Sequence, residues 1–149
     1  MGPRVDFYLL PATTTPDAFK YACRLAEKSY LSQQKTLIWT ASKEEAESIN
    51  VSLWTFRDIS FVPHAIYSPH PARANSGGPV LIAFENAPSS GEVLINLTEE
   101  IPAFFTHFNR VIEIVSDQTD ALAHSRKKYR LYREHDCELF SHNLKTPTV

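Results

Sequence analysis

Glycine is scarce in this 149-residue sequence, which contains only Gly2, Gly77, Gly78 and Gly91. A dinucleotide-binding GxGxxG fingerprint needs three glycines in one strand-to-helix turn, and a P-loop needs Gly-Lys followed by Ser or Thr. Neither pattern occurs, and neither does the GxSxG motif of serine hydrolases. Nucleotide chemistry is therefore disfavoured, and no cofactor is expected.

Cysteine is equally scarce, with Cys23 and Cys137 as the two examples. They form no CxxC pair and no disulfide framework, which is typical of a reducing compartment. The longest apolar runs are far shorter than the roughly 20 residues that span a bilayer. The N-terminal apolar run is too short for a signal peptide. We therefore expect a cytoplasmic protein with no membrane segment.

Charge of one sign is also lacking, since the formal net charge is -2. A general nucleic-acid-binding surface is not expected from this balance, so any basic function must be local. Hydrophobic residues make up 43% of the chain, which is enough for a core. The length suits one domain spanning residues 1–149.

Strand-like and helix-like segments alternate along the chain, which favours an α/β layer fold with a largely parallel sheet. The expected strands are 4–10, 36–40, 79–84, 93–97 and 110–115. The expected helices are 18–30, 42 to about 54, 101–107 and 117–134, the second opened by a capping box of Ser42 and Glu45. Residues 55–78 are expected to form a long surface excursion, and residues from about 135 to 149 an irregular tail.

Two groups of potential metal or catalytic side chains occur in the sequence. Cys137 lies near His135 and His142, which could form a thiol–imidazole pair or a metal site. The spacing fits no metal-site pattern, so a polar turn is the preferred interpretation. His64 and His70 lack a third ligand. No catalytic residue and no metal site is predicted.

The last expected helix carries a strong pattern of arginine. One of its faces is predicted to pack on the core and consists of Gln118, Leu122, Ser125, Tyr129 and Tyr132. Arg126, Arg130 and Arg133 form a second stripe, centred roughly 90° from the first. Lys127 and Lys128 add positive charge, and no acidic residue occurs from position 121 to 133.

Three interpretations of this helix remain open. Arginines beside tyrosines suit an acidic peptide with a hydrophobic anchor, because a guanidinium group can hold a carboxylate bidentately. They equally suit single-stranded nucleic acid, through phosphate contacts and base stacking. The third interpretation is a solvated helix face whose cations favour the helix dipole.

A second feature is a group of large apolar residues in the centre of the chain. Leu53-Trp54-Thr55-Phe56 is followed by Ser60-Phe61-Val62-Pro63-His64. Trp and Phe in a proline-bounded loop are favoured interface anchors. The alternative is that the loop folds back and buries them as a satellite core.

The order of four segments carries a resemblance that covers nearly the whole chain. The segments are Asp6–Leu10, Leu53-Trp54 with Ser60–His64, Gly77–Val80 before an apolar strand, and the last helix with its arginines and tyrosines. In these segments the sequence resembles the chi subunit family of the bacterial DNA polymerase III clamp-loader complex. The central segment is the most specific of the four.

The resemblance implies a Rossmann-like, doubly wound α/β domain with a mostly parallel sheet, helices on both faces and no bound nucleotide. It also implies a non-catalytic accessory subunit of the polymerase holoenzyme. Such a subunit links the clamp loader, through the psi subunit, to the acidic C-terminal tail of single-stranded-DNA-binding protein, and so contacts single-stranded DNA indirectly. Direct single-stranded nucleic-acid binding is the alternative, and an α/β enzyme is less favoured.

By matching positions, the resemblance also implies two sets of site residues. The acidic tail is expected at Val115, Arg126, Tyr129 and Arg130, with Arg133 extending the stripe. The psi subunit is expected at Trp54 and Phe61, with Val62 and Pro63 alongside. Two departures stand out: Arg130 replaces a common lysine, and the segment Glu134–Asn143 is longer and more acidic than the family's usual turn.

Overall fold

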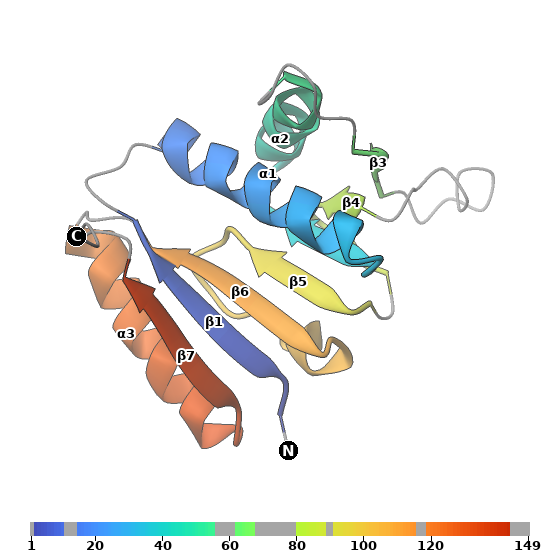
Figure 1. The fold of residues 1–149 in the computed structure, drawn as a ribbon. Coiled ribbons are helices and arrows are strands. Elements are labelled where there is room, and N and C mark those ends of the chain that lie inside the picture. The colour runs from blue at the N-terminus through green and yellow to red at the C-terminus, as the bar shows by residue number, and fades with distance from the viewer. Residues whose placement is uncertain are drawn as a thin grey trace, which may run out of the picture.

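The protein folds around one seven-stranded parallel sheet (Figure 1). The computed structural model describes residues 2–10, 15–55, 62–67, 80–88, 91–115 and 119–143. The strands are β1 (Arg4–Leu9), β2 (Thr36–Trp39), β3 (His64–Ile66), β4 (Val80–Ala83), β5 (Val93–Asn96), β6 (Arg110–Val115) and β7 (Glu138–Asn143). Their order in the sheet is β3-β4-β2-β5-β6-β1-β7, so β3 and β7 are the two edges.

Helices cover both faces of this sheet, as expected of a doubly wound fold. They are α1 (Thr15–Leu31), α2 (Lys43–Thr55), α3 (Thr119–Glu134) and the short 3-10 helix η2 (Ala103–His107). Helices α1 and α2 pack on one face, and α3 and η2 pack on the other (Figure 1). Among the described residues, no helix has both the length and the apolar character needed to cross a membrane.

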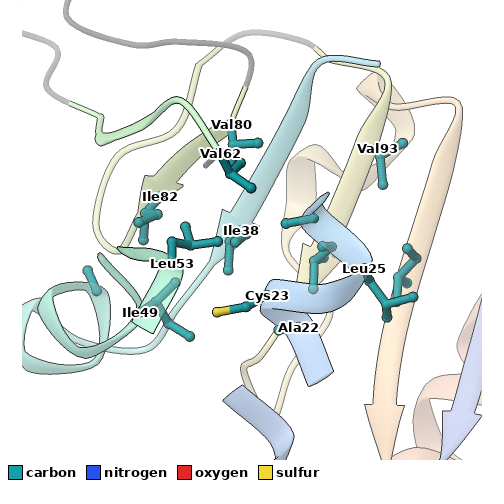
Figure 2. Close-up of a cluster of buried hydrophobic side chains, with 14 residues drawn as sticks. Ala22, Cys23, Leu25, Ile38, Ile49, Leu53, Val62, Val80, Ile82 and Val93 are labelled. Atoms are coloured by element: carbon teal, nitrogen blue, oxygen red, sulfur yellow. The ribbon is translucent and has the colours of Figure 1, made fainter. Parts of the chain in front are cut away.

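Each face has its own apolar core because side chains alternate along every strand. On β1, Val5 and Phe7 join the core under α3, whereas Tyr8 packs against the core under α1 and α2. Figure 2 shows the core under α1 and α2, to which Cys23 of α1 and Ile49 of α2 contribute. On α1, Ala22, Cys23 and Ala26 are fully buried in this core.

The capping box predicted for the second helix is present. The Glu45 backbone N–H donates to Ser42 Oγ at 3.2 Å, and Glu45 Oε1 accepts from the Ala41 N–H at 3.1 Å. The first bond satisfies an amide donor of the first helical turn, and the second ties the residue before the N-cap to the same turn. They explain why α2 begins at Lys43 rather than earlier.

Two expectations about irregular segments are wrong. Residues 64–66, inside the expected excursion, form the edge strand β3, and residues 138–143, inside the expected tail, form the edge strand β7. Strand β3 is too short for a periodic pattern. In β7, Leu139 packs towards the α3 core while Phe140 stays partly exposed. An edge strand that is buried on one side carries polar residues among its apolar ones, so its sequence resembles a polar loop.

One buried carboxylate connects three strands at the β7 side of the sheet. Asp6 of β1 is fully buried and accepts hydrogen bonds from Arg4 Nε at 3.1 Å, Arg110 Nε of β6 at 2.7 Å and His142 Nε2 of β7 at 2.8 Å. Burial alone would raise the pKa of the Asp6 carboxyl. The hydrogen bonds from Arg4, His142 and Arg110 outweigh burial and lower this pKa below the usual 3.8.

The Asp6 contacts predict a specific dependence of stability on pH. The pKa of the Asp6 carboxyl is lower in the folded state than in the unfolded chain. The Asp6 contacts therefore stabilise the folded state above about pH 4, and this stabilisation is lost as pH falls through the folded-state pKa. Asp6→Asn should reduce the free energy of unfolding by about 1–3 kcal/mol at neutral pH, with a smaller difference in acid. Urea unfolding at several pH values measures this. Asp136→Asn, at an exposed position, is the control, and parallel pH profiles for Asp6→Asn and wild type would contradict the prediction.

Candidate docking surface on the last helix

The arginine stripe predicted from the spacing of the last helix lies on the surface of α3. Arg126, Arg130 and Arg133 are all exposed, and we call these three residues the arginine ridge. Within the part of the chain that the structure describes, no carboxylate lies within salt-bridge distance of them. Exposed guanidinium groups that lack an internal acid keep their full capacity to bind an external one.

An apolar ledge adjoins the arginine ridge. Tyr129 is half-buried, its ring centroid lies 5.5 Å from that of Phe7 on β1, and the Arg133 guanidinium lies over its ring at 5.2 Å. Tyr129 and Val115 belong to the same apolar cluster, although Val115 at the end of β6 is only 3% exposed. Tyr129 is therefore the accessible apolar residue of the expected set, and Val115 supports the ledge from within.

The structure corrects the expectation for Lys128. The sequence places Lys127 and Lys128 together as extra positive charge beside the stripe, yet only Lys127 is exposed. Lys128 is buried, and its Nζ donates to Glu113 Oε1 at 2.8 Å and to the Thr98 carbonyl oxygen at 2.5 Å. Its charge is thus compensated inside the protein and is not available to a partner.

Glu113 is the centre of a buried polar network that sequence reasoning missed. Besides Lys128, its carboxylate accepts from Tyr132 Oη at 2.6 Å and from Asn96 Nδ2 at 2.8 Å. Asn96 in turn accepts from the backbone N–H and the hydroxyl of Thr98. The sequence contains one signal for this network: Glu113 is the only acidic residue in the apolar strand RVIEIV. A buried carboxylate in such a strand requires a partner.

Tyr132 remains a hydrogen-bond donor in this network. Burial raises the pKa of its phenol, and the adjacent negative charge of Glu113 raises it further. The prediction that Tyr132 faces the core is confirmed, since the side chain is fully buried. Ser125 is half-buried on the same side of α3, while the Leu122 side chain and Gln118 lie outside the described residues.

Two adjacent lysines provide a test of the network. Lys128→Met removes the cation that compensates buried Glu113 and should lower the free energy of unfolding by about 3–5 kcal/mol. Lys127→Met removes the same charge from an exposed position and should change it by less than about 0.5 kcal/mol. Chemical denaturation of both variants measures the difference, and equal effects would show that Lys128 is not held as described.

The residues of the second expected surface differ in how far they are exposed to solvent. Trp54 at the end of α2 is 48% exposed, and its ring lies 4.5 Å from that of His64. Val62 is fully buried, and in Figure 2 its side chain lies beside Val80 in the core. Val62 is therefore a core residue, and it can support the expected surface only from within. Pro63 is half-buried, and Phe61 lies outside the described residues.

The histidine residues near Cys137 contact other groups rather than its thiol. His135 Nδ1 lies 2.8 Å from the Leu131 carbonyl oxygen, and His142 binds Asp6. Cys137 is half-buried, and burial raises the pKa of its thiol. Burial also raises the pKa of Cys23 to about 12, so that thiol is unreactive. Across the described residues, no three His, Cys, Asp or Glu side chains gather as metal ligands.

Comparison with known proteins gives a consistent family match. The family model of the DNA polymerase III chi subunit, HolC, matches residues 2–140. The DNA polymerase III subunit chi of Pseudomonas aeruginosa is 33% identical over 142 residues, which is 95% of this chain and 96% of that protein. The subunit of the same name from Escherichia coli is 30% identical over 133 residues, covering 85% of this chain and 88% of the relative.

Solved structures with a similar fold are much more distant in sequence. T4 UvsW superposes with a TM-score of 0.65 at 11% identity over 95% of this chain, which spans 42% of that protein. The C-terminal domain of the DEAD-box protein Dbp5 superposes with a TM-score of 0.65 at 12% identity, covering 97% of this chain and 93% of the domain. At this identity the likeness describes the fold alone.

Proposed function

The chain belongs to the DNA polymerase III chi subunit family, and from that premise we propose that it is a non-catalytic adaptor of the replication machinery. It works in the cytoplasm and has two partners. The psi subunit connects it to the clamp loader. The acidic C-terminal tail of single-stranded-DNA-binding protein connects it to the coated DNA strand.

The observation that carries this proposal is the arginine ridge on α3. Its three guanidinium groups are exposed, and among the described residues none has an acidic partner, so carboxylates of the tail can pair with them. The accessible part of Tyr129 beside the ridge offers a contact for an apolar residue at the end of the tail. Charge thereby orients the tail and the apolar contact fixes its end.

Direct binding of single-stranded nucleic acid through the same helix is the alternative, and burial of the tyrosines disfavours it. Binding of that kind uses aromatic rings on which bases stack. Tyr129 is half-buried against Phe7, at 5.5 Å between ring centroids, and Tyr132 is fully buried, so neither tyrosine of α3 presents a fully accessible ring for stacking. An apolar side chain needs only the exposed part of Tyr129. Titration with a bare oligonucleotide discriminates between the two, because strong binding without the coating protein favours the alternative.

Removal of one ridge arginine should weaken binding of the tail. We expect Arg130→Ala to raise the dissociation constant for an acidic tail peptide about tenfold, equivalent to ~1.4 kcal/mol, and to reduce its salt dependence. Binding by the wild type should fall as salt rises, because salt screens exposed charges. Fluorescence anisotropy measures both effects.

Arg24→Ala is the matched control for the ridge arginine. It removes the same charge from an exposed position on α1, on the opposite face of the sheet, and should leave tail affinity unchanged. Salt-insensitive binding of the tail, or equal losses in the two variants, would rule out the ridge as the docking site.

The psi subunit is proposed to bind at the exposed end of α2. Trp54 supports this role, since a tryptophan that is 48% exposed is a typical interface anchor. Val51 lies one turn earlier on α2 and is also exposed, so the apolar area continues along the helix. Pro63 and Phe61 remain in the proposed set, and Val62 supports it from the core.

Trp54→Ala should abolish co-purification with psi and leave the fold intact. Loss of an anchor of this kind weakens an interface by about 2 kcal/mol or more, whereas truncation of an exposed side chain has little effect on stability. Pull-down and thermal unfolding measure the two effects. Leu31→Ala removes a similarly exposed apolar residue from the end of α1 and should retain psi. Unchanged assembly in Trp54→Ala would exclude Trp54 from the interface.

A further inference from the structure

We propose that the buried network around Glu113 is a positioning device that sets the rotation and the axial position of α3, and thereby orients the arginine ridge. The proposal rests on the proposed function in so far as tail binding is one of its readouts. It assigns Glu113, Lys128 and Tyr132 a role in the affinity of a site that none of them contacts.

The network is directional where the rest of the α3 packing is not. Lys128 and Tyr132 are four residues apart, so both point from the same side of α3 to the single carboxylate of Glu113. The aromatic contacts of this face include Tyr132 with Phe105 and Tyr129 with Phe7, at centroid distances of 5.3 and 5.5 Å, and the exposed pair of His124 and Glu99 is longer, at 3.8 Å. Ring packing tolerates small shifts, whereas hydrogen bonds of 2.6 and 2.8 Å to one carboxylate do not.

The position of Lys128 on the helix links this constraint to the ridge. Lys128 follows Arg126 by two residues, which places it about 200° around the helix and therefore on the side opposite the ridge. When Lys128 and Tyr132 are held against β6, the ridge must face outward. A shift by one residue would turn every side chain by about 100° and move it about 1.5 Å along the axis. Such a shift would carry Tyr129 away from Phe7 of β1, against which the ledge packs, and would turn the arginines out of their present direction.

The charges of the network compensate each other inside the protein. This indicates that the network contributes to the specific placement of α3 rather than to stability. Lys128 and Glu113 compensate each other, Thr98 accepts a further bond from Lys128, and Asn96 donates to Glu113. Replacement of a complete buried ion pair by apolar residues of similar volume is often neutral for stability. Stability and orientation should therefore be separable by substitution.

The experiment replaces the three side chains that connect α3 to β6 in one variant, E113L/K128M/Y132F, while Asn96 keeps its bonds to Thr98 and to the Glu100 carbonyl oxygen. We expect its urea-unfolding midpoint to stay close to that of the wild type, while its affinity for a synthetic polyaspartate peptide ending in phenylalanine falls about tenfold. Hydrogen exchange of the α3 amides should become faster. Ile49→Val in the opposite core is the control, since it should lower the unfolding midpoint and leave peptide affinity unchanged.

A milder variant covers the case in which the triple variant fails to fold. Y132F removes one hydrogen bond to Glu113 and should weaken peptide binding about threefold. Wild-type affinity and wild-type hydrogen exchange of α3 in the folded triple variant, or wild-type affinity in Y132F where the triple variant does not fold, would overturn the proposal.

The outcomes separate this proposal from the proposed function. If the wild type does not bind the acidic peptide, the docking function fails, and hydrogen exchange of α3 in the variants still decides whether the network positions the helix. If the wild type binds and the folded triple variant binds equally well with unchanged exchange, the docking function stands and the positioning role is lost.

Discussion

The structure of the candidate surface depends on one buried carboxylate. Glu113 lies in the middle of β6, a strand buried on both faces, where an uncompensated charge would be strongly destabilising. Helix α3 supplies Lys128 and Tyr132 to it, and β5 supplies Asn96. The helix can supply both groups only from one side, so its remaining cations point to solvent. An intramolecular requirement for charge compensation thus exposes a surface suited to an external acid.

The two proposed binding surfaces lie on opposite faces of the sheet. On one face, α3 presents the arginine ridge, and the segment that follows α3 returns as β7 to complete the sheet edge. On the other face, α2 carries Trp54 in its last turn and packs on a core that includes Val62 (Figure 2). Because a parallel sheet is rigid and buried between its helices, two partners on opposite faces can be held at a constant separation. This arrangement suits a subunit whose proposed task is to connect.

Much of the fold could be predicted from the sequence, and the errors share a cause. Strands β1, β2, β4, β5 and β6 are apolar runs, and the long helices have periodic cores or a capping box, so local pattern is sufficient for them. Strands β3 and β7 are the sheet edges. They are short or mixed in polarity, and they are strands because a neighbouring strand offers a hydrogen-bonding edge. Pairing of that kind depends on residues distant in the chain, as in β7 with β1, and leaves little local signal.

The arginine stripe of α3 follows from the amino-acid order alone, because helical geometry fixes the angles between residues of one helix. The amino-acid order also carries the family resemblance, through motifs that need no coordinates. The folded arrangement was needed to see that Lys127 is exposed while Lys128 is neutralised by Glu113, and that Trp54 is exposed while Val62 is buried. The physical reason is that exposure and charge compensation depend on which distant segment packs against a side chain. Neighbouring positions with similar composition can therefore have opposite environments.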